Sequence, residues 1–465
     1  MNTKKLRQKI LDLAIHGKLV PQDPNDEPAS VLLERIKAEK ERLIQEGKIK
    51  RSKKSKVSSD TPHYQNVPFE VPDNWVWTTV ENICSKIGSG STPKGSNYTS
   101  DGIFFFRSQN VHNLGIVLDD IKYISEDVHK SMIGTEVRPN DLLLNITGGS
   151  LGRCAIVPNI IDRGNVSQHV CILRPISIKA EYLHTFILSS FFARTMKITG
   201  SGREGLPKYN LEKMFLPLPP FAEQQRIVAE IKRWFAFVDQ IEQSKANLQT
   251  AIKQAKSKIL DLAIHGKLVP QDPNDEPAIE LLKRINPDFI PCDNGHYTQL
   301  PDGWTACRLE QVADILDNLR KPINSSERDS RIRNRQIDEL YPYYGATGQV
   351  GLIDDYIING NYLLLGEDGA PFLDKNAIKA YSISGKSWVN NHAHILSPKI
   401  DFEFLQYSLN QIDYSEYVNG STRLKLTQTD MRSIKIMLPP LAEQKRIKSK
   451  IQILFSQLDL MMESL

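Results

Sequence analysis

The stretch KILDLAIHGKLVPQDPNDEPA, residues 9–29, recurs without a change as residues 258–278. A second element, PPFAEQQRI at residues 219–227, returns as PPLAEQKRI at residues 439–447. A weaker echo lies between them, where PDNW at residues 72–75 matches PDGW at residues 301–304. Landmarks that repeat in the same order indicate an internal duplication. The chain therefore contains two units built on one plan.

Between these landmarks the two units differ. Residues 76–160 and 305–385 share no alignable sequence, although the segments that flank them are nearly identical. Such a pattern is typical of a protein that carries two different recognition surfaces on one duplicated scaffold. An old duplication followed by drift is the alternative, but drift does not explain an unchanged segment beside unrelated ones.

Apolar residues at alternating spacings of three and four predict a coiled-coil seam. The pattern starts after Pro219-Pro220 and stops at Gly266, which predicts one helix of about 44 residues. The predicted seam residues are Ile227, Ile231, Trp234, Val238, Ile241, Leu248, Ile252, Ile259, Leu262, Ile447, Ile451, Leu454, Leu458, Leu6, Ile10 and Leu13.

The seam of the C-terminal segment has its missing half at the N-terminus, because Leu6, Ile10 and Leu13 match Ala255, Ile259 and Leu262 in the repeat. We therefore expect the N-terminal helix to complete a second rod beside the central one. The alternative, in which each amphipathic helix packs on its own domain, accounts less well for the regular heptads. The predicted fold is mixed α/β, with two globular domains joined by a pseudo-two-fold antiparallel pair of long coiled-coil helices.

Composition sets only broad limits on the class of protein. The chain has 465 residues, 40% of them hydrophobic, and a net charge of +4 that permits a nucleic-acid partner without requiring one. Its five cysteines are scattered and predict neither a disulfide framework nor a zinc site. The absence of a signal peptide and of a long apolar run predicts a cytoplasmic protein with no membrane partner.

Within the variable regions, short apolar runs at residues 141–145 and 362–365 predict strands, and residues 180–195 predict a helix. Glu27 to Glu46 predict a further helix, followed by a basic stretch at residues 48–56 that is read as a solvated linker, with a phosphate-contacting arm as the alternative.

No catalytic signature is present in the sequence. The segment PLPPF at residues 217–221 lacks the acidic or amide residue that precedes this pattern in amino-methyltransferases. The glycines of residues 88–95 do not follow the order of a phosphate-binding loop. The segment GEDG at residues 366–369 is read as a turn, although either acid has the chemistry to accept a hydrogen bond from cytosine N4. We therefore expect no catalytic residue and no metal ligand.

Side chains with paired donors or acceptors, and cations placed for phosphates, are the candidates for DNA contact. In the first variable region they are Thr92, Lys94, Arg107, Ser108, Gln109, Asn110, Asn145, Thr147, Ser167, Gln168, Arg203 and Lys208. In the second they are Arg320, Lys321, Arg328, Arg331, Arg333, Tyr344, Thr347, Asn390, Asn391, Arg423 and Lys425. His169 and His392 stand at equivalent places before apolar runs, which favours a structural role for them over a base contact.

The duplicated elements resemble the specificity subunits of type I restriction-modification enzymes. The motif Pro-Pro-[Phe/Leu]-Ala-Glu-Gln-x-Arg-Ile and the Gly-Lys-Leu-Val-x-Gln motif after each long helix carry the resemblance, which covers essentially the whole chain. One departure is a permutation, because a closing element stands here at the N-terminus. The predicted domains are conserved helices with a basic linker (1–66), target-recognition domain 1 (67–218), the central helix and repeat (219–299), target-recognition domain 2 (300–438) and the C-terminal helix (439–465).

The resemblance implies a non-catalytic subunit of a prokaryotic complex that binds double-stranded DNA. Each variable domain would read one half of a bipartite asymmetric site. Two methyltransferase subunits would clasp the helices and methylate adenine, and restriction/translocase subunits would join that core. S-adenosylmethionine, ATP and Mg²⁺ would then belong to the partner subunits, with no cofactor in this chain. The alternatives are a stand-alone two-site DNA-binding regulator, a self-sufficient methyltransferase or nuclease, and a structural coiled-coil adaptor.

Overall fold

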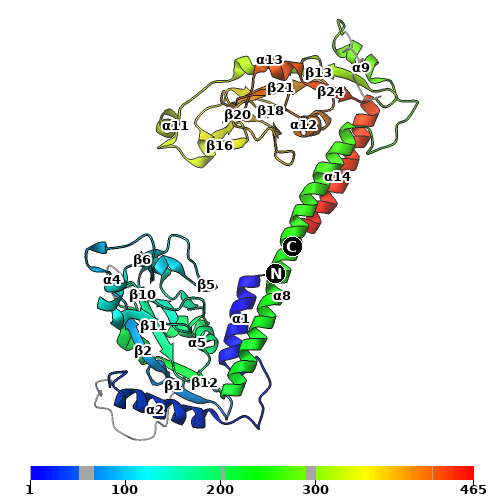
Figure 1. The fold of residues 1–465 in the computed structure, drawn as a ribbon. Helices are drawn as coiled ribbons and strands as arrows, with labels where there is room; N and C mark the ends of the chain where they lie inside the picture. Colours follow the sequence, from blue (N-terminus) through cyan, green and yellow to red (C-terminus); the bar gives the residue numbers. More distant parts are fainter. Residues whose placement is uncertain (1, 52–66, 200–204, 290–299, 421–422) are drawn as a thin grey trace. The chain divides into compact units, whose positions relative to one another are not determined.

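The computed structural model describes residues 2–51, 67–199, 205–289, 300–420 and 423–465 (Figure 1). The chain folds into two compact units, Met1–Gln243 and Ser244–Leu465. Each unit combines a mixed α/β domain with a pair of helices, which confirms the predicted fold class. The long central helix, α8, runs unbroken over the 44 residues Phe221–Ile264, as its apolar spacing predicts. Its first half belongs to the first unit and its second half to the second unit.

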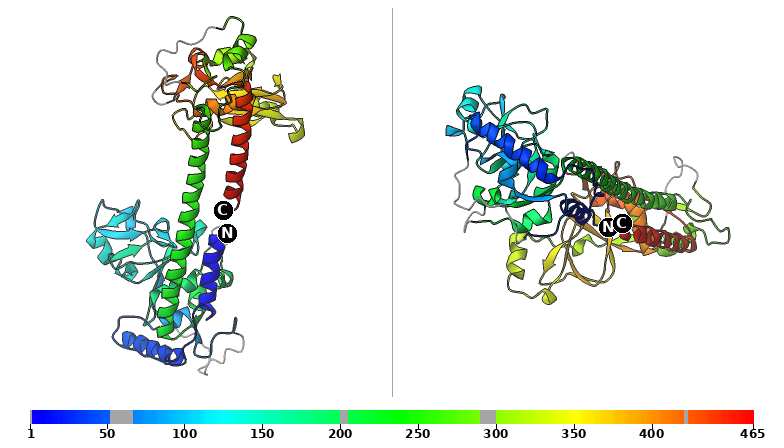
Figure 2. Two further views of the ribbon diagram at one scale, coloured as in Figure 1. Left: turned by 90° about the vertical axis from the view of Figure 1, so that its right-hand side faces the viewer. Right: turned by 90° about the horizontal axis from the view of Figure 1, so that it is seen from below.

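In the first unit, helix α1 (Thr3–Ile15) runs antiparallel to the first half of α8 (Figure 2). Ile10 and Ala14 of α1 pack against Ile227, Ile231 and Val238 of α8 in one buried cluster. Toward the start of α1, Arg7 forms ion pairs with Asp239 at 2.5 Å and Glu242 at 3.2 Å. The N-terminal helix therefore packs on the central helix, as the repeat predicts.

In the second unit, helix α14 (Leu441–Glu463) runs antiparallel to the second half of α8 (Figure 2). Ile447 and Ile451 of α14 share a buried cluster with Ala263 of α8. Farther along the pair, Lys256 forms an ion pair with Asp459 at 2.5 Å. Each half of α8 thus has a helical partner from a different end of the chain.

The predicted seam is only partly buried. Buried members are Ile10, Ile227, Ile231, Val238, Ile252, Ile447 and Ile451. Half-buried members are Leu6, Leu13, Ile259, Leu262, Leu454 and Leu458. The prediction was wrong for Trp234, Ile241 and Leu248, which are exposed by 38%, 41% and 44%. These three share one heptad position, whereas the buried Ile231, Val238 and Ile252 share the other, so only one of the two lines of the seam is covered over this stretch.

The first α/β domain contains two four-stranded sheets, with strand orders β2-β11-β8-β9 and β6-β3-β10-β7. Strands β1 and β12 form a two-stranded ribbon at the domain's base, and β4 and β5 form a hairpin. The strands are β1 (Val76–Thr79), β2 (Cys84–Ser89), β3 (Ile103–Phe106), β4 (Val111–His112), β5 (Gly115–Ile116), β6 (Lys122–Ile124), β7 (Glu136–Val137), β8 (Leu142–Asn145), β9 (Cys154–Ile156), β10 (Gly164–Val166), β11 (Val170–Pro175) and β12 (Phe215–Leu218).

The helices of this unit cover its sheets and its base. They are α2 (Ala29–Gln45), α3 (Val80–Ile83), α4 (Glu126–Ser131), α5 (Ala180–Ile187), α6 (Ser190–Thr195) and α7 (Lys208–Glu212). The prediction of a single helix over residues 180–195 is wrong, because the segment forms two helices, α5 and α6. Ser189 lies between them and caps α6 by accepting a hydrogen bond from Phe192 N at 3.2 Å. Helix α2 begins close to its predicted start and buries Leu32 and Ile36 in the domain core.

The second α/β domain repeats the same sheet topology. Its sheets have the orders β14-β21-β18-β19 and β16-β15-β20-β17, and β13 pairs with β24 at the base. In both domains one sheet contains a parallel central pair, β3 with β10 and β15 with β20. Two regions that share no alignable sequence therefore fold alike, which the sequence alone does not predict.

The strands of this domain are β13 (Thr305–Arg308), β14 (Ala313–Ile315), β15 (Tyr341–Gly345), β16 (Gly348–Ile353), β17 (Ile358–Asn359), β18 (Tyr362–Gly366), β19 (Ala380–Ile383), β20 (Lys386–Val389), β21 (Ala393–Pro398), β22 (Val418–Asn419), β23 (Lys425–Leu426) and β24 (Lys435–Leu438). The remaining helices are α9 (Ala278–Ile285), α10 (Leu309–Val312), α11 (Ser325–Ile332), α12 (Phe402–Gln411) and α13 (Gln428–Ser433).

A buried glutamate ties each helix pair to its domain. In the first unit Glu223 accepts hydrogen bonds from Trp75 Nε1 at 2.8 Å and Gln22 Nε2 at 2.6 Å. In the second unit Glu443 accepts from Trp304 Nε1 at 3.0 Å and Gln271 Nε2 at 3.2 Å. We call each of these triads a clamp.

The chemistry of the clamp explains why its glutamate, tryptophan and glutamine recur in both units. Burial raises the pKa of both Glu223 and Glu443, although the hydrogen bonds from tryptophan and glutamine act in the opposite direction. One turn later, Arg446 forms an ion pair with Asp275 at 2.6 Å, and the first unit has the same pair. The two repeated motifs are therefore the two halves of one contact.

Replacing Glu443 by alanine is expected to lower the free energy of unfolding of the second unit by about 2 kcal/mol, because two buried donors lose their acceptor. Hydrogen exchange in urea, read by mass spectrometry, measures this loss unit by unit. The matched variant Glu223→Ala should destabilise the first unit instead. If peptides that contain Trp304 are equally protected from hydrogen exchange in the wild type and in Glu443→Ala, the clamp does not stabilise the second unit.

Candidate nucleic-acid interface

Polar side chains gather where strands β8 and β18 end, at the same place in each domain. Residues after both strands are held by the same backbone hydrogen bonds: Ile146 N donates to His169 O at 3.0 Å, and Glu367 N donates to His392 O at 2.8 Å. The neighbouring residues form matching bridges, Thr147 with Gly205 and Asp368 with Lys425.

These matches define a strand-end corner with four equivalent positions in each domain. In the first domain the corner consists of Thr147, Gln168, His169 and Gly205. In the second domain it consists of Asp368, Asn391, His392 and Lys425. Only the histidine is common to both corners. Because loops at strand ends leave side chains accessible, the corner is suited to contact a ligand.

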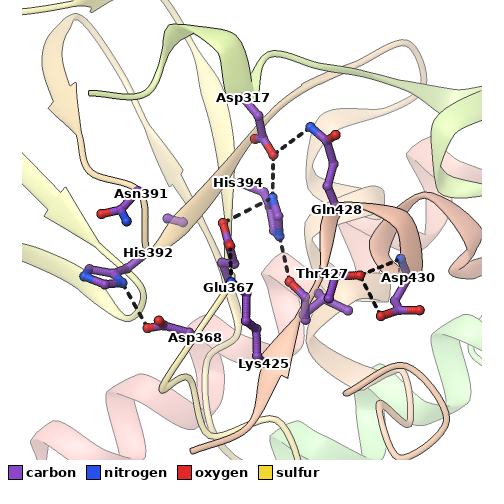
Figure 3. Close-up of polar contacts among 12 residues, drawn as sticks. Asp317, Glu367, Asp368, Asn391, His392, His394, Lys425, Thr427, Gln428 and Asp430 are labelled. Atoms are coloured by element: carbon purple, nitrogen blue, oxygen red, sulfur yellow. Dashed lines mark hydrogen bonds and ion pairs between the residues drawn. The ribbon is translucent and has the colours of Figure 1, made fainter. Parts of the chain in front are cut away.

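The corner of the second domain is highly charged (Figure 3). His392 Nδ1 lies 3.0 Å from Asp368 Oδ1, and Arg423 pairs with the same carboxylate. Lys425 Nζ lies 3.2 Å from Glu367, which also pairs with Arg320. Arg320 also pairs with Asp317, so three cations accompany three carboxylates, and the corner carries no excess of negative charge that would repel DNA.

Behind this corner lies a buried pair that supports it. His394 is fully buried and its Nδ1 lies 2.6 Å from Asp317 Oδ2, while its Nε2 lies 3.0 Å from Leu426 O (Figure 3). Asp317 also accepts from Gln428 Nε2 at 3.0 Å and Ile395 N at 3.1 Å. Burial opposes ionisation of Asp317, but the hydrogen bond and charge of His394 outweigh it, and the pKa of Asp317 is lowered overall.

The basic segment Arg320–Arg335 lies against aromatic rings of the second domain. The Arg328 guanidinium stacks over Tyr343 at 5.2 Å, and that of Arg331 over Trp388 at 5.0 Å. Lys321 approaches the same Trp388 ring at 5.5 Å. Arg333 is exposed, as is Thr347, and Tyr344 is half-buried. The aromatic rings thus support the basic segment and fix Arg328 and Arg331 in place.

In the first domain, the candidates around Arg107 form a hydrogen-bonded group of their own. Arg107 and Gln109 both bond to Asp120, the latter at 2.9 Å. Lys122, Arg107 and Gln109 together lower the pKa of Asp120 to about 2. Among the other candidates, Thr92 contacts Gln168, and Lys94 and Lys208 are exposed. Ser108 is half-buried and uses its carbonyl to accept from Asn145.

Several predicted DNA contacts are corrected by burial. Asn110 and Asn145 are fully buried, Ser167 and Asn390 nearly so, and the Arg320 side chain is 16% exposed. Asn145 Nδ2 donates to Ser108 O at 2.8 Å, and Asn390 Oδ1 accepts from His392 N at 2.8 Å. Asn145 and Asn390 thereby hold the loops behind the surface through hydrogen bonds to the backbone. Arg203 and the basic residues 52–56 lie outside the described residues.

Sequence reasoning missed Asp317 and Trp388, which organise the second domain. Asp317 lies in an ordinary polar stretch, and no spacing links it to His394, 77 positions away. Trp388 likewise lies far in sequence from the basic segment, and only the fold brings its ring under Arg331.

Metal and membrane chemistry find no support in the described ranges. Within them, no group of three or more histidine, cysteine or acidic residues is placed to hold a metal ion. No helix of those ranges is long and apolar enough to cross a membrane.

The duplicated fold and its two polar corners define a class of protein that comparison identifies. The family model described as "Type I restriction modification DNA specificity domain" matches residues 72–250 and 301–465. The chain belongs to this family, whose specificity subunits are the non-catalytic recognition components of type I restriction-modification systems.

Named relatives agree along almost the whole chain. The type I restriction enzyme EcoAI specificity subunit from Escherichia coli is 29% identical over 539 aligned positions, covering 96% of this chain and 88% of the relative. The EcoEI specificity subunit from Escherichia coli is 27% identical and covers 98% of this chain and 89% of the relative. A solved structure from work on complex assembly and conformational transition of the type I R-M system has the same fold, with a TM-score of 0.56 and 18% identity, covering 85% of this chain and 94% of that chain.

Proposed function

We propose that this specificity subunit reads a bipartite, asymmetric site in double-stranded DNA, with one half-site for each α/β domain. The observation that carries the proposal is the strand-end corner, which is built twice on the same sheet topology with different side chains. Two binding surfaces of the same shape and different chemistry are what two unlike half-sites require.

The helix pairs are proposed to dock two methyltransferase subunits, which methylate adenine, and restriction/translocase subunits join that core. Exposed apolar side chains support this role. In the first unit they include Trp234, Phe237 and Ile241 on α8, and in the second unit Leu460 and Met461 on α14. Large apolar side chains exposed on a helix flank mark interaction sites. S-adenosylmethionine, ATP and Mg²⁺ are proposed to be bound by those partners.

Mapping methylated adenines tests the proposal directly. The chain is co-expressed with an adenine methyltransferase subunit, and modified adenines are located genome-wide by single-molecule sequencing. We expect one bipartite motif with a non-specific spacer. A variant with Lys321→Ser and Arg333→Ser, at two exposed cations of the second domain, should relax or lose only the second half of the motif.

A matched variant in the first domain, Lys94→Ser, changes another exposed cation and should leave the second half of the motif unchanged. A stable complex that methylates without any motif would contradict the proposal. Tight sequence-specific binding by the chain alone, with no gain from the methyltransferase, would favour a stand-alone regulator.

A further inference from the structure

Two histidines of the second domain, His394 on strand β21 and His392 just before it, have opposite surroundings. His394 is fully buried, and both of its ring nitrogens have partners within the domain. His392, two residues earlier, has a side chain that is 39% exposed. Figure 3 shows His394 directed inward to Asp317, whereas His392 lies apart from it beside Asp368. The two rings therefore serve different purposes, and only that of His394 is accounted for by the fold.

The His392 ring is held by one edge. Its Nδ1 atom is buried and lies 3.0 Å from Asp368 Oδ1, although the angle is not that of a hydrogen bond. In the first domain His169 Nδ1 lies 2.8 Å from Thr147 Oγ1, at the equivalent position. Anchoring at Nδ1 orients an imidazole and leaves Nε2 to meet a ligand. The residue beside Nδ1 thus differs between the domains, whereas the position of the histidine ring is the same in both.

We propose that His169 and His392 each bind a DNA phosphate through Nε2 and thereby fix the register of their domain on the duplex. This inference rests on the proposed function. Two domains that read different half-sites meet different bases but the same sugar-phosphate backbone. A side chain common to both corners therefore matches the common element, since phosphate contacts position a protein without carrying sequence information.

The positions around the histidine differ between the corners, and these are the ones available for bases. Thr147 and Gln168 of the first domain correspond to Asp368 and Asn391 of the second. Gln168 and Asn391 are exposed amides, which can pair with adenine, and Asp368 can accept from cytosine. The two corners thus combine one constant backbone contact with variable base contacts.

The charges that face each histidine are compatible with a phosphate. Around His392, Asp368 is paired with Arg423, and Glu367 is paired with Lys425 and Arg320. In the first domain Thr147 and Gln168 are uncharged, and the Gln168 amide nitrogen lies 3.3 Å from His169 Nε2. Because the Gln168 side chain is exposed, it can move aside or donate to the same phosphate.

The test measures binding of the assembled complex, this chain with its methyltransferase subunits, to two DNA duplexes. One duplex carries the full bipartite site and the other carries a mismatched second half. Dissociation constants are measured from 50 to 200 mM salt for the wild type, His392→Ala and His392→Lys. For His392→Ala we expect binding to both duplexes to weaken about tenfold, as for one lost charge-assisted hydrogen bond. The ratio between the duplexes should stay unchanged.

The salt dependence separates a phosphate contact from a structural role. The titrations are made at pH 5.5, where an imidazole bound to a phosphate carries a charge. The slope of log K against log salt should then decrease by about 1 in His392→Ala, and His392→Lys should restore it. The control is His394→Ala, which disturbs the fold beneath the corner. Protein of this variant that remains folded should show the wild-type slope of log K against log salt. A changed ratio between the duplexes, or an unchanged slope in His392→Ala, would overturn the inference while leaving the proposed function intact. A wild-type complex that does not discriminate between the duplexes would instead contradict the proposed function.

Discussion

Replacing Asp317 by alanine is expected to lower the free energy of unfolding of the second unit by about 3 kcal/mol. The side chain is nearly buried, and its loss takes this carboxylate away from the fully buried His394 ring and from the Arg320 guanidinium. Gln428 Nε2 and Ile395 N lose their acceptor in the same change. Urea-dependent hydrogen exchange over residues 386–398 measures the loss in β20 and β21, and peptides of the first unit provide an internal reference.

The matched control is Asp314→Ala, which removes an aspartate from the preceding strand. Asp314 is 56% exposed and pairs with Lys399 at the surface, so its loss should leave protection unchanged. If Asp317→Ala and Asp314→Ala lowered the protection equally, Asp317 would not stabilise the second unit through its buried contacts. Since the pKa of Asp317 is lowered in the folded chain, its contribution is complete above the ordinary aspartate range and is lost as pH falls through the folded value. Asp317→Asn should flatten this acid limb.

The double substitution Trp234→Glu with Ile241→Glu is expected to weaken binding of the methyltransferase subunit by at least about 100-fold. Trp234 and Ile241 are exposed on one flank of α8, and interface energy concentrates in large side chains such as tryptophan. Two carboxylates on that flank would have to lose their water on binding. Titration calorimetry or co-purification with the methyltransferase subunit measures the loss.

A matched pair on the same helix tests whether charge alone has this effect. Ala229 and Ala236 are exposed on another face of α8, and Ala229→Glu with Ala236→Glu adds the same two charges. This control should bind the methyltransferase normally, and both variants should retain the wild-type melting temperature. Equal losses in the two double variants would show that the apolar flank is not the docking site.

The helices and the duplication were predictable because their signals are local or exact. Apolar spacing set α8 to its observed length, and the repeated motifs placed its partners. What periodicity could not supply was the burial of individual positions. Trp234 and Ile241 fit the heptad as well as Val238 does, yet only Val238 is covered, because burial at each position depends on where the partner helix lies against α8.

The DNA candidates were less predictable, because chemistry alone does not tell a surface amide from a buried one. Asn145 and Asn391 have identical donors and acceptors, but Asn145 is fully buried and supports a loop whereas Asn391 is exposed. Arg320 satisfied the criterion for a phosphate contact, yet Asp317 and Glu367 bind it within the domain. Such partners lie far away in sequence, and only the fold brings them together.

The linked charges of the second corner have a consequence for how this subunit can evolve. Asp368 pairs with Arg423 and lies 3.0 Å from His392 Nδ1, so a single substitution there removes a partner from both side chains. Under the proposed function, stepwise substitution toward a new DNA target would therefore pass through variants that bind DNA poorly. Residues 9–29 and 258–278, by contrast, have the same sequence, and both clamps accept the same motif. Exchange of an entire domain between genes would keep the residues of both clamps, and under the proposed function it would be the less obstructed path to a new specificity.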